Sequence, residues 1–164
     1  MPACGKTTYY FNNLLTEENR IIRINFDSII KLVTPEKYNF HMMPVYKAIE
    51  KEMIIGSLNL GLDIYLDRTN LNRKARKYFH LMVQDYEPTK VALFFDVSLE
   101  ICRQRNFYAD RDKTEVEKQG IAEMYDIMDQ KLSFPKEEEF DIIKVIDAQG
   151  KNSRKEIREF YTES

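Results

Sequence analysis

The sequence predicts an α/β fold in which a parallel sheet carries helices on both faces. Three observations lead to this prediction. Strand-like and helix-like segments alternate along the chain, and the strand-like segments are apolar runs without apolar/polar alternation. In addition, residues 4–8 contain a glycine and have the form of the closing half of a phosphate-binding loop that leads into a helix.

The first part of the chain is expected to contain one strand and three helices. A helix over residues 7–15 follows the loop, and three isoleucines predict a strand at 21–25. A short helix is expected at 28–33, because Pro35 cannot continue it. Apolar residues within 44–61 recur with helical spacing, which predicts a helix with one buried face. These apolar residues are Val45, Ile49, Met53, Ile54 and Leu58.

The alternation of strands and helices continues in the second part. A compact strand ends at Asp67, and a helix with helical apolar spacing follows at 71–86. An apolar run of strand length lies at 90–97, and Ser98 is a suitable N-cap for the helix after it. The last expected elements are a strand at 141–147 and a closing helix at 153–161. No repeat or linker divides the chain, so a single domain spanning residues 1–164 is expected.

Composition limits the classes of protein that fit. The chain has 164 residues, enough for one domain with a substantial core. Its formal net charge of -2 gives no global positive field, so an anionic substrate would need a local cluster of Lys and Arg. The two cysteines lack metal-ligand spacing, which favours a reducing compartment. No apolar run has the length of a membrane span and no signal pattern is seen, so a cytoplasmic protein without membrane partners is expected.

Gly5, Lys6 and Thr7 fill the last three positions of the phosphate-binding pattern GxxxxGK[ST], and Thr8 extends the nucleotide-binding candidates. In such a loop, backbone N–H groups surround the phosphates, the Lys reaches the β and γ phosphates, and the Ser/Thr hydroxyl binds Mg²⁺. The alternative is a glycine turn followed by an exposed lysine. The first glycine of the pattern and the strand before it would lie upstream of Met1, so the chain is expected to be N-terminally incomplete.

Two aspartates follow predicted strands, at the sheet edge where open α/β sheets bind ligands. Asp27 comes just after the strand at 21–25, where a carboxylate can take the proton from an attacking hydroxyl. Asp67 ends the next strand and is a candidate to hold Mg²⁺ through a bound water. Each aspartate has an alternative role as the N-cap of the helix that follows it.

Three arginines, Arg103, Arg105 and Arg111, cluster around the end of the helix that Ser98 begins. Arginines that close over a nucleotide can neutralise the charge that develops on a transferred phosphoryl group. The alternative is a helix end whose arginines are only solvated.

Taken together, these segments resemble the polynucleotide 5′-hydroxyl kinase family, the end-healing P-loop kinases of phages and bacteria. PACGKTT resembles that family's PGSGKST loop, and INFD resembles the strand that ends in its catalytic Asp. LDRTNLNRKAR is similar to its DTNLN segment. FDVSLEICRQRN, followed by Arg111, resembles its FDV strand and arginine-bearing lid, and VEKQGIAEMYDIM is similar to the helix that follows the lid.

The resemblance implies an ATP-dependent kinase with ATP and Mg²⁺ as cofactors. It implies that Lys6 contacts the β and γ phosphates, that Thr7 binds Mg²⁺, and that Asp27 is the general base. Arg105 and Arg111 would be lid arginines that contact the nucleotide phosphates. The expected reaction is phosphoryl transfer to a hydroxyl, with a polynucleotide 5′-OH as the first candidate acceptor.

The resemblance also leaves the acceptor open. It implies that Asn70 lies close to the phosphate site, but the family usually has an acceptor-gripping Arg three residues after the catalytic Asp. This chain has Ile30 there and Lys31 next to it. A Lys supplies charge but not the two-pronged contact of an Arg. A nucleic-acid 5′ end, a small-molecule or nucleoside hydroxyl, and a non-catalytic nucleotide-binding module therefore all remain as interpretations.

Overall fold

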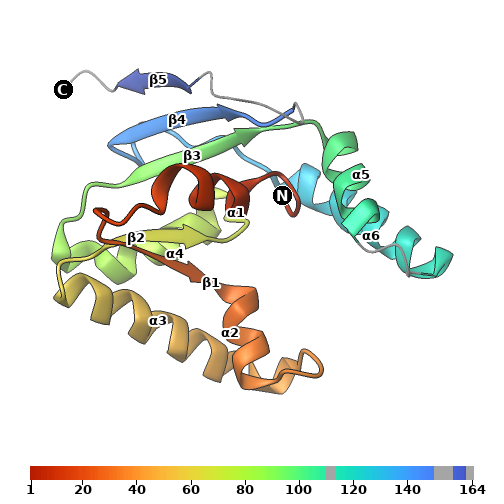
Figure 1. Cartoon of the computed structure of the whole chain (residues 1–164), viewed down its shortest axis with the longest axis horizontal. Helices are drawn as coiled ribbons and strands as arrows, with labels where there is room; N and C mark the ends of the chain where they lie inside the picture. The colour runs from red at the N-terminus through yellow and green to blue at the C-terminus, as the bar shows by residue number, and fades with distance from the viewer. Residues whose placement is uncertain (110–113, 150–156, 162–164) are drawn as a thin grey trace. The chain divides into compact units, whose positions relative to one another are not determined.

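A computed structural model of the chain describes residues 1–109, 114–149 and 157–161. The chain divides into two compact units. One consists of Thr7–Arg68, and the other consists of Met1–Lys6 together with Thr69–Ser164. We call them the Thr7–Arg68 unit and the loop unit, because the second contains Gly5 and Lys6 of the phosphate-loop pattern. Figure 1 shows the elements of both units, and each unit is described by itself below.

In the Thr7–Arg68 unit, a two-stranded parallel sheet packs against one long helix. The sheet joins β1 and β2, and α3 contacts both strands and also α2 (Figure 1). The register pairs Asn25 with Asp67, so the carboxyl ends of both strands lie at one edge. The elements are α1 (Lys6–Tyr9), which enters the unit, the π-helical turn η1 (Tyr10–Leu14), β1 (Ile21–Asn25), α2 (Phe26–Val33), the 3-10 turn η2 (Phe40–Met42), α3 (Met43–Asn59) and β2 (Asp63–Asp67).

The predicted helix over 44–61 is confirmed, and its predicted buried face is right in part, because Ile54 is buried. Val45 is 40% exposed, whereas the buried stripe of α3 includes two polar residues. The stripe consists of Tyr46, Glu50, Ile54 and Ser57. Glu50 is buried because Arg68 neutralises it, with Nη1 at 2.7 and 2.5 Å from its two carboxylate oxygens. A hydrophobic pattern cannot identify a buried carboxylate, so the prediction missed Glu50 and included the exposed Val45.

The loop unit has a three-stranded sheet in which β4 is central. β3 and β4 are parallel, with Asp96 opposite Asp147 at their carboxyl ends, and β5 runs antiparallel to β4. The helices α5 and α6 pack against each other. The elements are α4 (Arg73–Val83), the 3-10 turn η3 (Gln84–Tyr86), β3 (Val91–Asp96), α5 (Leu99–Ala109), α6 (Glu115–Lys131), β4 (Ile142–Asp147) and β5 (Ile157–Tyr161).

The α/β class with parallel strands and helices is confirmed, but the closing helix predicted at 153–161 is wrong. Residues 157–161 form a strand whose Ile157 pairs with Ile146. The outer edge of β4 offers a row of backbone N–H and C=O groups, and pairing with it satisfies both strands. A helix of under ten residues gains little from propensity alone, so this edge decides the conformation. The sheet of the loop unit is therefore mixed.

The described strands also form two hydrogen-bonded sheets, where the sequence pattern suggests a single one. Within the described residues, β2 pairs with β1 alone and β3 pairs with β4 alone. In the same part of the chain, no helix combines the length and the apolar character needed to cross a membrane.

Candidate nucleotide site

The phosphate-loop segment has the backbone shape that anion binding requires. Ala3 and Gly5 have φ values of 53° and 97°, on either side of Cys4. Alternating left-handed and right-handed residues turn successive N–H groups toward one concave side, which is how backbone nests bind phosphate. Gly5 is needed in this position, because its φ is one that residues with a Cβ rarely adopt.

The loop is anchored to the helices α5 and α6 of its own unit. Cys4, Cys102 and Tyr125 form a buried cluster. The Tyr125 hydroxyl lies 3.1 Å from the carbonyl oxygen of Pro2 and 3.3 Å from that of Cys102. Burial raises the pKa of Tyr125 to about 12, so the hydroxyl remains a donor at neutral pH. Burial also raises the pKa of the Cys102 thiol, which makes this residue a packing group and a poor nucleophile.

Lys6 is folded back over its own loop. Its Nζ donates to the carbonyl oxygen of Met1 at 2.5 Å and lies 3.4 Å from the Cys4 sulfur. The side chain is partly buried, which differs from the exposed lysine of the alternative interpretation. An ammonium held by a carbonyl and a thiol can exchange these partners for phosphate oxygens by rotation of its flexible stem.

Of the two clustered arginines that the structure describes, Arg103 and Arg105, the second lies beside the loop. Its Nη2 donates to the carbonyl oxygen of Ala148 at 2.6 Å. A Cβ added to Gly5 would lie 3.8 Å from the Cβ of Ala148, so the loop and Arg105 meet at the same residue. Arg103 instead pairs with Asp126 on α6 and so ties two helices together. Arg111 lies outside the described residues.

At the strand ends of the Thr7–Arg68 unit, Thr7 and Asp67 are brought together. The Thr7 hydroxyl donates to Oδ2 of Asp67 at 2.8 Å, across 60 residues of sequence. Asp67 is only 4% exposed, and Asn25 donates to its backbone carbonyl at 3.2 Å. The alternative role of Asp67 as an N-cap is wrong, because Asn72 caps α4 by accepting from the N–H of Ala75.

Arg23 belongs to this cluster, and the sequence analysis missed it. Its Nε and Nη2 lie 2.9 and 2.6 Å from Oδ2 of Asp67, and Nη2 lies 3.2 Å from the Thr7 hydroxyl. The sequence does contain one indication of this role, because a single arginine interrupts the isoleucines of β1. A charged residue within a half-buried strand needs an opposite charge nearby, and Asp67 ends the neighbouring strand.

Asp27 lies exposed at the amino end of α2. The alternative role of Asp27 as an N-cap is wrong, because Asn25 has that position and its Oδ1 accepts from the N–H of Ser28 at 2.9 Å. The carboxylate of Asp27 therefore has no capping role to perform. The preceding residue, Phe26, lies under the Arg68 guanidinium, with 4.0 Å between Cζ and the ring centroid. Arg68 thus joins the buried Glu50 of α3 to the segment that carries Asp27, another contact that the sequence did not indicate.

The predicted neighbour of the phosphate site, Asn70, has a left-handed backbone with a φ of 35°. Its carbonyl oxygen is 3.4 Å from Nη1 of Arg76, which also contacts Glu139. The backbone of Asn70 is therefore held by a buried arginine of its own unit. Thr8 is exposed in α1.

The family model described as AAA domain matches residues 1–133 of the chain, and the chain belongs to this family. It is thus a P-loop nucleotide-binding domain, in a family that includes kinases. No curated protein matches the chain.

Each unit, taken by itself, has groups that fit one part of a magnesium-bound nucleotide. In the loop unit, the loop offers backbone N–H groups and one ammonium for phosphates. In the Thr7–Arg68 unit, Thr7 and Asp67 offer a hydroxyl and a carboxylate oxygen. Hard oxygen ligands of this kind suit Mg²⁺. Among the described residues, no group of three or more His, Cys, Asp or Glu could hold a metal. A magnesium ion would therefore take its other ligands from phosphate and water, as it usually does.

Proposed function

We propose that the protein transfers the γ-phosphoryl group of ATP to a hydroxyl acceptor, with a polynucleotide 5′-OH as the first candidate. One observation carries this proposal beyond nucleotide binding. The loop threonine, Thr7, is hydrogen-bonded at 2.8 Å to a buried strand-end carboxylate, Asp67, while Asp27, in the first turn of the helix that follows the neighbouring strand, is exposed. One carboxylate is thus suited to metal binding and the other to accepting a proton.

Each candidate residue then has a distinct task. The nest around Gly5 and the ammonium of Lys6 bind the phosphates, and Thr7 with Asp67 would hold Mg²⁺. The ion supplies positive charge that stabilises the phosphates during transfer. Asp27 accepts the proton of the acceptor hydroxyl as its oxygen bonds to the γ-phosphorus, while the bond to the β-phosphate oxygen breaks and ADP leaves.

The arginines complete the proposed nucleotide site. Arg105 supplies a guanidinium beside the loop, held by the Ala148 carbonyl until a nucleotide phosphate replaces that partner. The resemblance gives Arg111 the same kind of role. Arginine suits both places because its planar fork matches a phosphate with two parallel hydrogen bonds.

A small-molecule or nucleoside acceptor is the second candidate, and one feature of α2 favours it. Ile30, three residues after Asp27, is half-buried, and Lys31 is exposed. This turn of the helix therefore offers no two-pronged contact for the phosphate of a polynucleotide acceptor. Acceptor binding by Lys31 alone would be weaker and more dependent on salt.

The test is transfer of labelled γ-phosphate from ATP, with Mg²⁺, to a 5′-OH oligonucleotide and, in parallel, to nucleosides and small hydroxyl compounds. Asp27→Asn should lower the rate by about 10²- to 10⁴-fold, the usual contribution of a general base. Asp63→Asn is the matched control, because Asp63 is an exposed aspartate at the opposite, amino end of β2. ATP binding without transfer to any acceptor would instead support a non-catalytic nucleotide-binding module.

A further inference from the structure

One carboxylate oxygen in the Thr7–Arg68 unit accepts hydrogen bonds from three donor groups. Oδ2 of Asp67 accepts from the Thr7 hydroxyl at 2.8 Å and from Nε and Nη2 of Arg23 at 2.9 and 2.6 Å. The same Nη2 lies 3.2 Å from the Thr7 hydroxyl oxygen. The guanidinium therefore contacts two oxygens of this pair that a magnesium ion could use, Oδ2 of Asp67 and the Thr7 hydroxyl oxygen.

The burial of Asp67 explains why a cation is held there. The side chain of Asp67 is 2% exposed, while that of Arg23 is 21% exposed. A carboxylate removed from water is costly unless a positive group and hydrogen bonds replace its hydration. Arg23 provides both, so the carboxylate is already neutralised before any metal ion arrives.

A guanidinium and a divalent cation cannot both use this oxygen. Mg²⁺ needs the oxygen lone pairs in near-octahedral geometry at close range, and the two cations would repel each other at such a distance. Binding of the ion through Oδ2 therefore requires the guanidinium to leave this oxygen. An ion at the other carboxylate oxygen, or on a water bound there, would still be repelled by the guanidinium.

We propose that Arg23 is an internal counter-ion of Asp67 that competes with the divalent cation and so sets the metal requirement of the nucleotide site. It is a positioning residue, because it acts on the metal ligands Thr7 and Asp67. This inference rests on the proposed function only in taking these two residues as the metal ligands.

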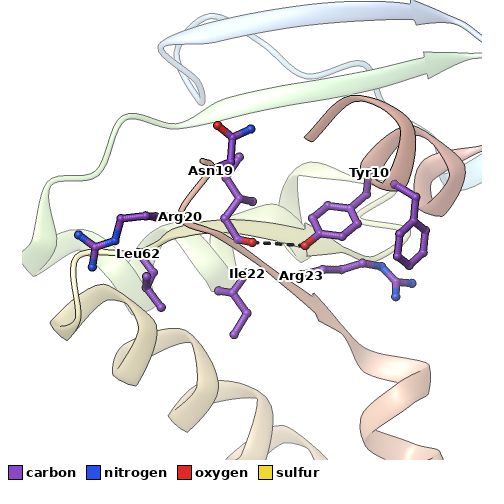
Figure 2. Close-up of a pocket in the computed structure, with 8 residues that line it drawn as sticks. Tyr10, Asn19, Arg20, Ile22, Arg23 and Leu62 are labelled. Carbon is purple, nitrogen blue, oxygen red and sulfur yellow. Dashed lines mark hydrogen bonds between the residues drawn. The ribbon is translucent and has the colours of Figure 1, made fainter. Parts of the chain in front are cut away.

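The surroundings of Arg23 give its side chain room to move. Arg23 lines a pocket of about 450 Å³ together with Tyr10, Phe11, Ile22 and Leu62 (Figure 2). Its Cζ lies 5.8 Å from the centroid of the Phe11 ring, within the range of a cation–π contact. The guanidinium can thus leave Asp67 and still keep a favourable contact on the aromatic side of the pocket.

The experiment measures Mn²⁺ binding to the full chain by electron paramagnetic resonance, with ADP present. Arg23→Gln should bind Mn²⁺ about tenfold more tightly than the unchanged protein, because the competing state is removed. Asp67→Asn should abolish this tight binding. Arg20→Gln is the matched control and should bind Mn²⁺ as the unchanged protein does, because the Arg20 guanidinium donates to the Leu60 carbonyl at 3.0 Å.

A folded Arg23→Gln variant with equal or weaker Mn²⁺ binding would overturn the proposal, and so would a lack of saturable binding in both proteins. If Arg23→Gln does not fold, Arg23→Lys keeps the charge but loses the two-pronged contact. It should then bind Mn²⁺ more tightly than the unchanged protein, and equal binding would overturn the proposal.

The outcome is separate from that of the kinase assay. If Arg23→Gln binds Mn²⁺ more tightly but no acceptor is phosphorylated, the counter-ion role of Arg23 is supported and the proposed reaction is contradicted. If phosphoryl transfer occurs and Mn²⁺ binding does not change in Arg23→Gln, the counter-ion role alone fails.

Discussion

The buried ion pair between Arg76 and Glu139 in the loop unit is expected to be costly to break by the removal of one partner. Arg76 lies on α4 and reaches Glu139 with Nε at 2.9 Å and Nη2 at 2.8 Å, one to each carboxylate oxygen. Both side chains are 7% exposed. Arg76 also donates to the Ser133 carbonyl at 2.9 Å, so one guanidinium joins α4 to the segment before β4. Arg76→Met removes all these contacts while it keeps most of the apolar stem.

The expected magnitude follows from this burial. Removal of one partner of a buried pair leaves an uncompensated charge and costs about 3–5 kcal/mol. That is a large part of the roughly 5–15 kcal/mol by which a whole domain is stable. The double variant Arg76→Met/Glu139→Met leaves no charge unpaired. Its free energy of unfolding should therefore fall by no more than that of Arg76→Met alone.

Urea unfolding followed by circular dichroism measures these differences. The matched control is Arg73→Met, because Arg73 pairs with Glu138 on the same two segments at 2.7 Å. These side chains are 61% and 55% exposed, and an exposed pair contributes about 0–1 kcal/mol. If Arg76→Met loses no more stability than Arg73→Met, or if the two losses simply add in the double variant, burial does not govern the strength of the pair.

Three further predictions concern the loop and pH. Gly5→Ala, at a φ of 97°, should be strained by about 1–2 kcal/mol and weaken ADP binding in calorimetry. Gly120→Ala is its control, because nothing lies within 4 Å of an added Cβ in that helix, and ADP binding should not change. Tyr125→Phe should lower the free energy of unfolding by about 1 kcal/mol and weaken ADP binding, and equal effects from Tyr78→Phe, at an exposed tyrosine, would contradict a special role. Hydrogen bonds from an arginine hold the pKa of Glu139 below its usual 4.5, so its contribution is present above that pH and lost below it. The stability gap between the unchanged protein and Glu139→Gln should therefore narrow as unfolding is repeated at pH values falling through this range.

Most of the elements could be predicted because they depend on short stretches of chain. The isoleucines of β1 and the apolar runs of β3 and β4 are strands in the structure. The N-cap predicted for α5 is also confirmed, with the Ile101 N–H at 3.3 Å from the Ser98 hydroxyl. The capping alternatives for two aspartates failed for a local reason that could have been seen. Asn25 and Asn72 stand at the helix starts, and Asn is among the strongest N-cap residues.

Elements that depend on distant partners were predicted less well. Residues 157–161 form a strand because they pair with the edge of β4. The spacing of apolar residues within the nine positions 153–161 carries no information about that edge. The buried face of α3 was predicted only in part, because Glu50 is buried only where Arg68 can reach it. In both places the contact partner, and not the local pattern, decides the structure.

By itself, the sequence determined the α/β class, the phosphate-loop pattern and the positions of the first four strands along the chain. These follow from backbone conformation and from the spacing of apolar residues, which act over a few neighbouring positions. The tertiary structure alone decided which of the 25 basic and 27 acidic residues meet. Arg23 and Asp67 are 44 positions apart, and Arg76 and Glu139 are 63 apart. Charge pairing of this kind depends on distance in space and on burial, and neither can be read from neighbouring letters of the sequence.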